Sequence, residues 1–211
     1  MRKDLLLFIM FLTVSVRLHG NLSFHHLSVN DGLSQLSVLS LYQDELNNIW
    51  MGTFAGANRY DGRTFSSFTP HDEHQTPILG NEIISISGDR AGRVFLLSEN
   101  GLSVINIKNN EIVNIPNSSM TAIKMGKKHL WVAINNQLHF LTPKNQLIRS
   151  NIQSSDVEPI TAILEHSSGA IWLGSTKGCT VSSPRKSDIE IRASPLITTL
   201  YEDRSGNVWI G

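Results

Sequence analysis

Short stretches in which apolar and polar residues alternate recur along most of the chain, and turn residues separate them. The alternation is clearest at Leu39 and Leu41 and again at Ile84 and Ile86. A period of two places alternate side chains on one face of a strand, so these stretches predict β-strands. The turns hold Asp and Gly, as at residues 203–206, because Asp bonds to nearby backbone and Gly accepts a positive φ angle. The pattern therefore predicts antiparallel hairpins.

The strand pattern belongs to an internal repeat that one aromatic position marks. All four tryptophans and one phenylalanine occupy this position, at intervals of 36 to 45 residues: Trp50, Phe95, Trp131, Trp172 and Trp209. In three copies Asp stands six residues before the aromatic residue, and in three copies Gly stands six residues after it. A repeat of about 40 residues with four short strands is typical of a β-propeller blade.

A blade has two apolar faces, which become buried only when neighbouring blades stack. We therefore predict that the repeated tryptophans are core residues at equivalent, largely buried positions between blades. The predicted fold class is all-β, a β-propeller with four four-stranded blades and the start of a fifth. The copy around Trp131 lacks both the Asp and the Gly, and its spacing alone assigns it a blade.

The repeat divides the chain into a predicted series of segments. An N-terminal closing strand and lead-in are expected at residues 21–37, with the strand at 23–27. The blades are expected at residues 38–80, 81–118, 119–155 and 156–194, and residues 195–211 begin a fifth. Closure of a propeller requires its first and last blades to meet. We therefore expect this sequence to be the N-terminal part of a longer protein or a truncated gene product.

The first 20 residues predict an export signal. Arg2 and Lys3 precede an apolar run at residues 5–16, and this run is shorter than the roughly 20 residues that span a bilayer. Cleavage is expected near Gly20, and an uncleaved N-terminal anchor is the alternative. The mature chain is then expected to be soluble in the periplasm. The lone Cys179 is predicted to be a small buried residue, since it has no partner for an internal disulfide.

Composition and motifs exclude several classes of function. The 18 Lys and Arg residues balance 18 Asp and Glu residues, which argues against a nucleic-acid partner. No Gly-rich phosphate loop, nucleophile elbow or His-Glu-x-x-His motif occurs. Residues 71–74 hold two His and two acidic residues that could bind a divalent metal, although a solvated loop is the preferred interpretation. We therefore assign no catalytic, cofactor-binding or metal-binding residue.

The sequence resembles the two-component regulator propeller. The resemblance rests on residues 27–34, 38–44, 49–53 and 58–62, with Phe65, and it covers residues 24–211. It implies the periplasmic sensor region of a hybrid two-component system, which recognises an oligosaccharide and signals to a membrane histidine kinase. The partners that it implies are an oligosaccharide, the rest of the propeller and that kinase, and a homodimer is left open. The kinase chemistry itself is not expected in this chain.

The expected ligand-binding face consists of the loops between second and third strands and those from each fourth strand to the next blade. It would gather residues 53–56, 98–101, 175–178, 71–74 and 150–159, where polar residues suit hydrogen bonding to hydroxyl groups. Single ligand contacts are not predicted. A propeller glycoside hydrolase or lyase is one alternative, disfavoured because Asp precedes Trp by six residues rather than the five of a sialidase turn box. A secreted protein-interaction propeller is the other.

Overall fold

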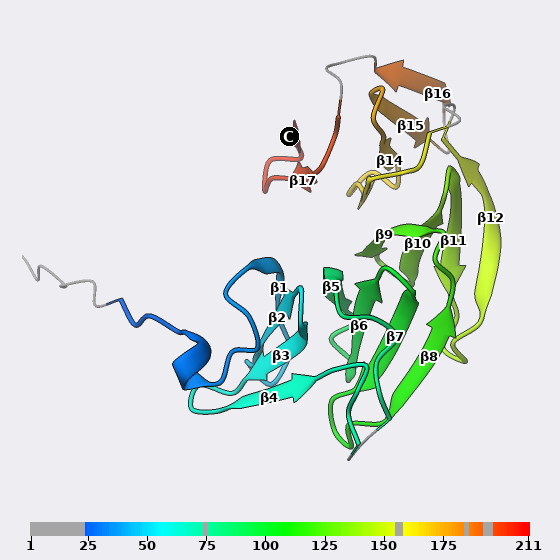
Figure 1. The fold of residues 1–211 in the computed structure, drawn as a ribbon. Helices are drawn as coiled ribbons and strands as arrows, with labels where there is room; N and C mark the ends of the chain where they lie inside the picture. The colour runs from blue at the N-terminus through cyan, green and yellow to red at the C-terminus, as the bar shows by residue number, and fades with distance from the viewer. Residues whose placement is uncertain (1–23, 74–75, 155–157, 184–185, 192–195) are drawn as a thin grey trace, which may run out of the picture.

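Four antiparallel sheets of four strands follow one another along the chain, and a two-stranded sheet comes after them. The computed structural model describes residues 24–73, 76–154, 158–183, 186–191 and 196–211. The sheets stand side by side around an arc, with the first strand of each sheet on the inner side and the last on the outer side (Figure 1). The predicted export signal at residues 1–20 lies outside the described residues.

The strands pair in chain order within each sheet. The first two sheets contain β1 (Val38–Gln43), β2 (Ile49–Thr53), β3 (Gly56–Tyr60), β4 (Phe65–Phe68), β5 (Ile83–Gly88), β6 (Arg93–Ser98), β7 (Gly101–Asn106) and β8 (Ile112–Pro116). The others contain β9 (Met120–Met125), β10 (Leu130–Ile134), β11 (Gln137–Leu141), β12 (Leu147–Gln153), β13 (Ala162–Glu165), β14 (Ile171–Gly174), β15 (Cys179–Ser183), β16 (Lys186–Ile191), β17 (Leu200–Glu202) and β18 (Val208–Ile210). The predicted fold class, a β-propeller of four full blades and the start of a fifth, is confirmed.

The turn between the first and second strands explains why Asp precedes Trp by six residues. One oxygen of Asp44, Oδ1, accepts hydrogen bonds from the backbone N–H groups of Leu46 and Asn48, both at 2.9 Å. The other oxygen, Oδ2, accepts from the Asn48 side chain at 2.9 Å and from Trp50 Nε1 at 2.8 Å. The carboxylate therefore closes the turn and fixes the indole ring.

The same turn recurs with different partners in other blades. Asp203 repeats every one of these bonds and accepts from Trp209 Nε1 at 3.0 Å. Asp89 binds Arg93 Nε at 2.7 Å, because Phe95 has no N–H group to offer. The third blade has no carboxylate in its own turn. There Glu165, on β13 of the next blade, accepts from Trp131 Nε1 at 2.8 Å.

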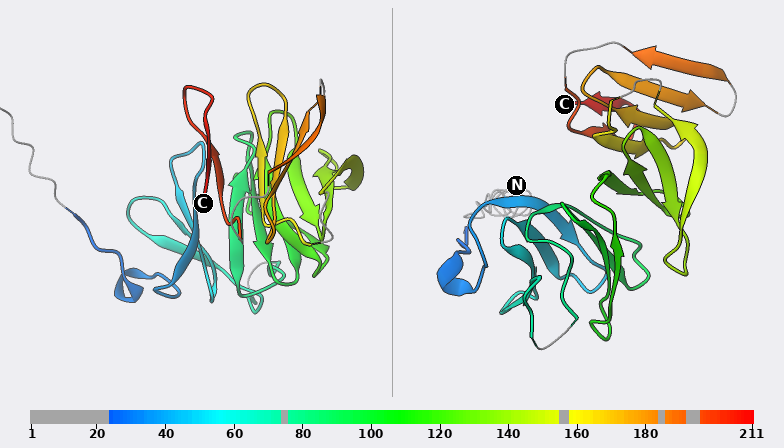
Figure 2. Two further views of the ribbon diagram at one scale, coloured as in Figure 1. Left: turned by 90° about the horizontal axis from the view of Figure 1, so that it is seen from above. Right: turned by 45° about the vertical axis from the view of Figure 1, so that its right-hand side comes forward.

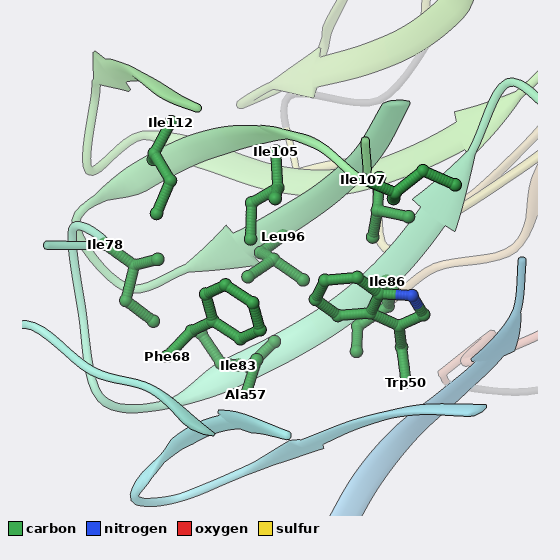
Figure 3. Packing of buried hydrophobic residues seen from close by; sticks show 11 residues of the cluster. Trp50, Ala57, Phe68, Ile78, Ile83, Ile86, Leu96, Ile105, Ile107 and Ile112 are labelled. Carbon is green, nitrogen blue, oxygen red and sulfur yellow. The ribbon is translucent and has the colours of Figure 1, made fainter. Parts of the chain in front are cut away.

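The core is a series of apolar layers between neighbouring sheets. Trp50 and Phe68 stack at 5.2 Å in the first layer and meet Ile83 and Leu96 of the second sheet (Figure 3). The first four of the repeated aromatic residues each face the sheet that follows their own. Trp50 and Phe95 are fully buried, and the exposed fraction of Trp131 is 9%. The predicted core role is confirmed for these three residues.

The prediction of largely buried tryptophans is wrong for Trp209. Its side chain is 63% exposed, and Tyr201, directly opposite it on β17, is 61% exposed. Both point to the side where a following sheet would pack, and no described residue forms such a sheet. Trp172 is only half-buried, because the two-stranded sheet β17–β18 covers less of it than a full blade would.

The lead-in covers part of the face of the first blade that points away from the second blade. Leu33 is buried, and Ser34 donates its backbone N–H to Asn58 Oδ1 at 3.1 Å. The preceding residues, 24–28, have no regular secondary structure and lead into a short 3-10 turn, η1 (Val29–Asp31). The closing strand expected at residues 23–27 is therefore not formed in the described part, and its closing role stays a prediction, as do the exact blade boundaries. No helix in the described part is long and apolar enough to cross a membrane.

Glycine two residues after the tryptophan allows the next blade to approach. A Cβ atom on Gly174 would lie 2.6 Å from Ile197 Cγ2, and one on Gly52 would lie 2.6 Å from the backbone oxygen of Ile83. Ile83 is the first residue of β5, and Ile197 lies just before β17, so both neighbours are at the start of the following blade. The sequence pattern Trp-x-Gly is thus a packing requirement between blades.

We expect Gly174→Ala to lower the free energy of unfolding by about 1–3 kcal/mol, because the added methyl group forces neighbouring blades apart. Urea denaturation of the full chain measures this change. Ala133 occupies the same repeat position in the third blade, so Ala133→Gly is the control and should change stability by less than about 1 kcal/mol. A Gly174→Ala variant as stable as the original chain would refute the packing argument.

Candidate functional site

A hollow of about 730 Å³ lies on the inner side of the arc. Figure 2 shows the arrangement of the sheets from two further directions. Residues of β1, β5, β9, β13 and β17, together with residues next to these strands, line it. Every sheet therefore contributes its first strand. The volume falls within the range of about 300–1,000 Å³ that ligand pockets occupy.

Several hydroxyl groups along these inner strands are used to join neighbouring blades. The hydroxyl groups of Ser40, Thr121 and Thr161 each donate to a backbone oxygen at the start of the next blade. These oxygens belong to Ile83, Ile160 and Ile197, at 3.3, 2.6 and 2.5 Å. Ser87 Oγ accepts from the backbone N–H of Met125 at 3.1 Å. These hydroxyl groups hold the arc together, so they are poor candidates for ligand contacts.

Basic side chains outnumber acidic ones in the lining of the hollow. Arg90, Lys124 and Lys127 line it, and among the described residues Asp89 is the only acidic one in the lining. Burial alone would raise the pKa of Asp89, but hydrogen bonds from Arg93 and from backbone N–H groups outweigh it and hold that pKa below its usual value. Lys127 Nζ donates to the backbone oxygens of Ser167 and His166 at 2.7 and 3.2 Å. Arg90 and Lys124 form no ion pair within the described residues.

The loops predicted to bind ligand lie together on one face of the arc. Gly56 N–H donates to the backbone oxygen of Asn81 at 2.7 Å, which ties a second-to-third-strand turn to the loop entering the next blade. Ile197 N–H and the backbone oxygen of Ser175 make the same connection at 3.0 Å in the fourth blade. Hydrogen bonds of the backbone thus fix the relative positions of both loop sets.

The hydroxyl groups on that face are structural. Thr53, Ser98 and Ser175 are buried, and their hydroxyl groups donate across their own turns to the backbone oxygens of Gly56, Gly101 and Gly178, at 2.9, 3.2 and 3.3 Å. The turn tips instead present Phe54, which is 49% exposed, and the charged pair Lys177 and Glu158, whose Nζ and Oε1 atoms are 3.1 Å apart. The sequence identified the turns but not the direction in which their side chains point.

The histidine-rich loop is only partly within the described residues. His71 and Asp72 are described, and His74 lies outside them, as do residues 155–157 of the other predicted loop. Within the described part of the chain, no three His, Cys, Asp or Glu side chains are grouped as a metal site requires. The contacts of these two loops with a ligand stay a prediction.

Cys179 is buried, as predicted, with 2% of its surface exposed. Burial raises the pKa of its thiol to about 11, so the thiol is protonated at neutral pH and unsuited to act as a nucleophile. In contrast, hydrogen bonds from the Asn207 side chain, the Asn207 backbone and Trp209 lower the pKa of Asp203 to about 2. This carboxylate is therefore ionised at neutral pH and cannot donate a proton in catalysis.

Sequence analysis missed two features of this site. The hollow itself was missed, because the inner strands are identifiable by their alternation but their curvature around a common axis is not. Glu165 was missed as the partner of Trp131, because it precedes the turn of the following blade and lies 34 residues away. A carboxylate just before a turn, where the preceding blade lacks its own Asp, is the signal that could have found it.

Comparison with known proteins identifies the repeat. The sequence pattern of the family described as "Two component regulator propeller" matches residues 32–55 and 193–211. A curated relative named Histidine kinase P4, from Formosa agariphila, is 38% identical over 69 residues, which are 32% of this chain and 5% of that protein. Two segments of the chain therefore match the two-component regulator propeller repeat, and the chain spans a small part of the length of this relative.

Solved structures share the fold. The extracellular domains of two proteins described as hybrid two-component systems of B. thetaiotaomicron align with TM-scores of 0.71 and 0.62, each at 18% identity. They cover 84% and 88% of this chain, which in turn covers 26% and 34% of theirs. Virginiamycin B lyase from Staphylococcus aureus, made catalytically inactive by replacing a histidine, aligns at a TM-score of 0.67 and 15% identity, over 92% of this chain and 68% of the lyase.

Proposed function

We propose that this chain is part of the ligand-sensing propeller of a hybrid two-component signalling protein. In this proposal it is non-catalytic, recognises an oligosaccharide and passes the signal to a membrane histidine kinase in the same protein. The observation that carries the proposal is the family repeat, which matches near the start and at the end of an uninterrupted series of blades. The shared fold of two extracellular domains of hybrid two-component systems supports it.

The concave, inner side of the arc is the proposed place of ligand binding. All five sheets contribute to the hollow, so a ligand that contacts residues of several blades can alter the angles between them. Besides the apolar layers, individual hydrogen bonds join neighbouring blades, such as that from the Thr161 hydroxyl group to the backbone oxygen of Ile197. Such bonds adjust to small rotations more readily than a continuous sheet does, which suits a sensor that reports occupancy.

Export to the periplasm is the second part of the proposal. The basic residues and short apolar run at the N-terminus support it, and so does the extracellular origin of the two related structures. A fusion of residues 1–30 to a reporter that is active only in the periplasm tests this part. Reporter activity is expected, and cytoplasmic retention of the fusion would contradict it.

Binding without turnover is the test of the proposed function. Calorimetric titration of the full chain with a panel of neutral and acidic oligosaccharides should give saturable heat for at least one of them. Chromatography of the same samples after prolonged incubation should show that the sugar is unchanged. Heat of binding accompanied by cleavage products would support the hydrolase or lyase alternative, and the absence of binding to any member would contradict the proposal.

The lyase alternative is disfavoured by the lining of the hollow. The related lyase loses its activity when a histidine is replaced, whereas none of the described histidines in this chain lines the hollow. His129 packs against Phe140 with ring centroids 4.9 Å apart. His166 Nδ1 accepts from the backbone N–H of Ser168 at 3.0 Å, and its Nε2 lies 3.1 Å from the backbone oxygen of Gly206. Both imidazoles thus have structural roles.

A further inference from the structure

The two ends of the hollow carry different charges. The turns between first and second strands present exposed basic side chains, namely those of Arg90, Lys127, Lys128 and Arg204. At the opposite end, the loops present Glu82, Glu99 and Glu158, with Lys177 as the cation paired to Glu158. Of the acidic residues at the basic end, Asp44, Asp89 and Asp203 are saturated by hydrogen bonds within their own turns. Glu45 is exposed in the turn between β1 and β2, but it does not line the hollow.

Two cations of the basic end are free to meet a ligand. Arg90 and Lys124 are exposed, line the hollow and have no ion-pair partner among the described residues. The third lining cation, Lys127, is held by the turn of the next blade. Uncompensated positive charge in a concave site concentrates anions there and raises their rate of association.

The backbone of Arg90 is unusual among the turns. Five described residues other than glycine have a positive φ angle, and four of them are asparagines, which tolerate this conformation; the fifth is Arg90, at 54°. Arg204 occupies the same turn position after Asp203 and does not show a positive φ. Strained conformations of this kind concentrate at ligand sites, where the position of a side chain matters more than local stability.

A neutral polar group lies beside these cations. The hydroxyl oxygen of Tyr42 is buried and has no hydrogen-bond partner among the described residues. Tyr42 lines the same hollow, and its ring packs so closely over Gly88 that a Cβ atom there would lie 2.4 Å from the hydroxyl oxygen. Because this oxygen is fully buried against Gly88, we do not count Tyr42 among the ligand contacts.

We propose that the hollow binds an acidic oligosaccharide, with Arg90 and Lys124 contacting its carboxylate or sulfate groups at the end formed by the turns between first and second strands. This inference rests on the proposed function and names the class of its ligand. It also places the charged contacts at the end opposite to the loops that the sequence suggested. Carboxylates and sulfates share the chemistry that guanidinium and ammonium groups recognise.

The experiment compares matched ligands on the full chain. Calorimetry is performed with galacturonic acid trimers, a sulfated galactose trimer and the neutral galactose trimer. We expect the two acidic sugars, or one of them, to bind at least tenfold more tightly than the neutral one. This preference should weaken as salt is raised from 50 to 500 mM, because screening acts on exposed charges.

Matched variants separate the site from general surface charge. Arg90→Asn removes the cation and suits the positive φ angle, so we expect about tenfold weaker binding of the acidic sugar with an unchanged or raised melting temperature. Lys124→Gln should weaken binding by a similar factor. Arg204→Asn makes the same charge change at the same turn position outside the hollow and should leave affinity within twofold.

The outcomes distinguish this inference from the proposed function. If the neutral trimer binds as tightly as the acidic ones, and Arg90→Asn has no effect, the inference about acidic ligands is wrong while oligosaccharide sensing stands. If Arg204→Asn weakens binding as much as Arg90→Asn does, binding depends on the general surface charge, and the assignment of the binding site to the hollow is wrong. If no member of the wider panel binds, both fail.

Discussion

Replacing Trp50 by Ala is expected to lower the free energy of unfolding by about 3–5 kcal/mol, the range typical of large aromatic residues removed from a core. The indole ring is fully buried between the first two blades and stacks on Phe68. Its Nε1–H donates to Asp44, which is itself buried. The variant would therefore leave a cavity and also an unpaired carboxylate oxygen.

Urea denaturation followed by circular dichroism measures this change, since the loss of one tryptophan alters the fluorescence signal itself. Trp209→Ala is the matched control, because Trp209 occupies the same repeat position and makes the same hydrogen bond, yet is 63% exposed. We expect the control to lose less than half as much stability. Equal losses in both variants would contradict the claim that each tryptophan is stabilised by the blade that follows it.

Replacing Asp44 by Ala is expected to have the second-largest effect, about 2–4 kcal/mol. The variant removes four hydrogen-bond acceptor contacts and leaves the buried Nε1–H of Trp50 without a partner. An unsatisfied buried donor is unfavourable, because water cannot reach it to replace the lost bond. Equilibrium denaturation of the full chain measures this loss.

Asp203→Ala is the control for this prediction. Asp203 makes the same four hydrogen bonds in a turn that solvent reaches, so water can replace the carboxylate. We expect a clearly smaller loss of stability for Asp203→Ala than for Asp44→Ala. If the two variants lose equal stability, burial is not what makes the turn important, and the repeat is maintained for another reason.

The repeat itself could be predicted from sequence, since it depends on local chemistry. The Asp of the turn, the Trp six residues later and the Gly two residues after it all act within one hairpin and the layer beside it. Their spacing is therefore visible in the chain. The strand pairings around Trp50 and Trp172 follow directly from this local order.

Other features could not be predicted, because they depend on contacts that the repeat pattern does not specify. The exposure of Trp209 is decided by whether a sheet packs on it, and its own hairpin is identical in kind to that of Trp50. The blade of Trp131 lacks the Asp of the turn, and Glu165 of the next blade supplies the carboxylate in its place. The hydroxyl groups of Thr53 and Ser98 looked available for a ligand, but each is turned back onto its own turn.

The end of the hollow at which we propose the charged contacts could not be predicted from the sequence. Polar loops suggested one face, whereas the unpaired cations Arg90 and Lys124 mark the other end of the hollow. Arg90 lies in the Asp-Arg-x-Gly turn that recurs with Arg204, so the turn motif does not single it out, and Lys124 belongs to no recognisable motif. Arg90 stands out only through its backbone angle, and Lys124 only through its place on the inner strand β9.

Ligand-dependent phosphorylation tests the central claim most directly. Membranes that contain the full-length protein carrying this propeller are incubated with labelled ATP, with and without the oligosaccharide that binds the chain in calorimetry. The account predicts that the sugar changes the level of phosphorylated kinase, and that it is recovered intact afterwards. A phosphorylation level that does not respond to the bound sugar, together with cleavage of that sugar, would contradict a sensing role for this propeller.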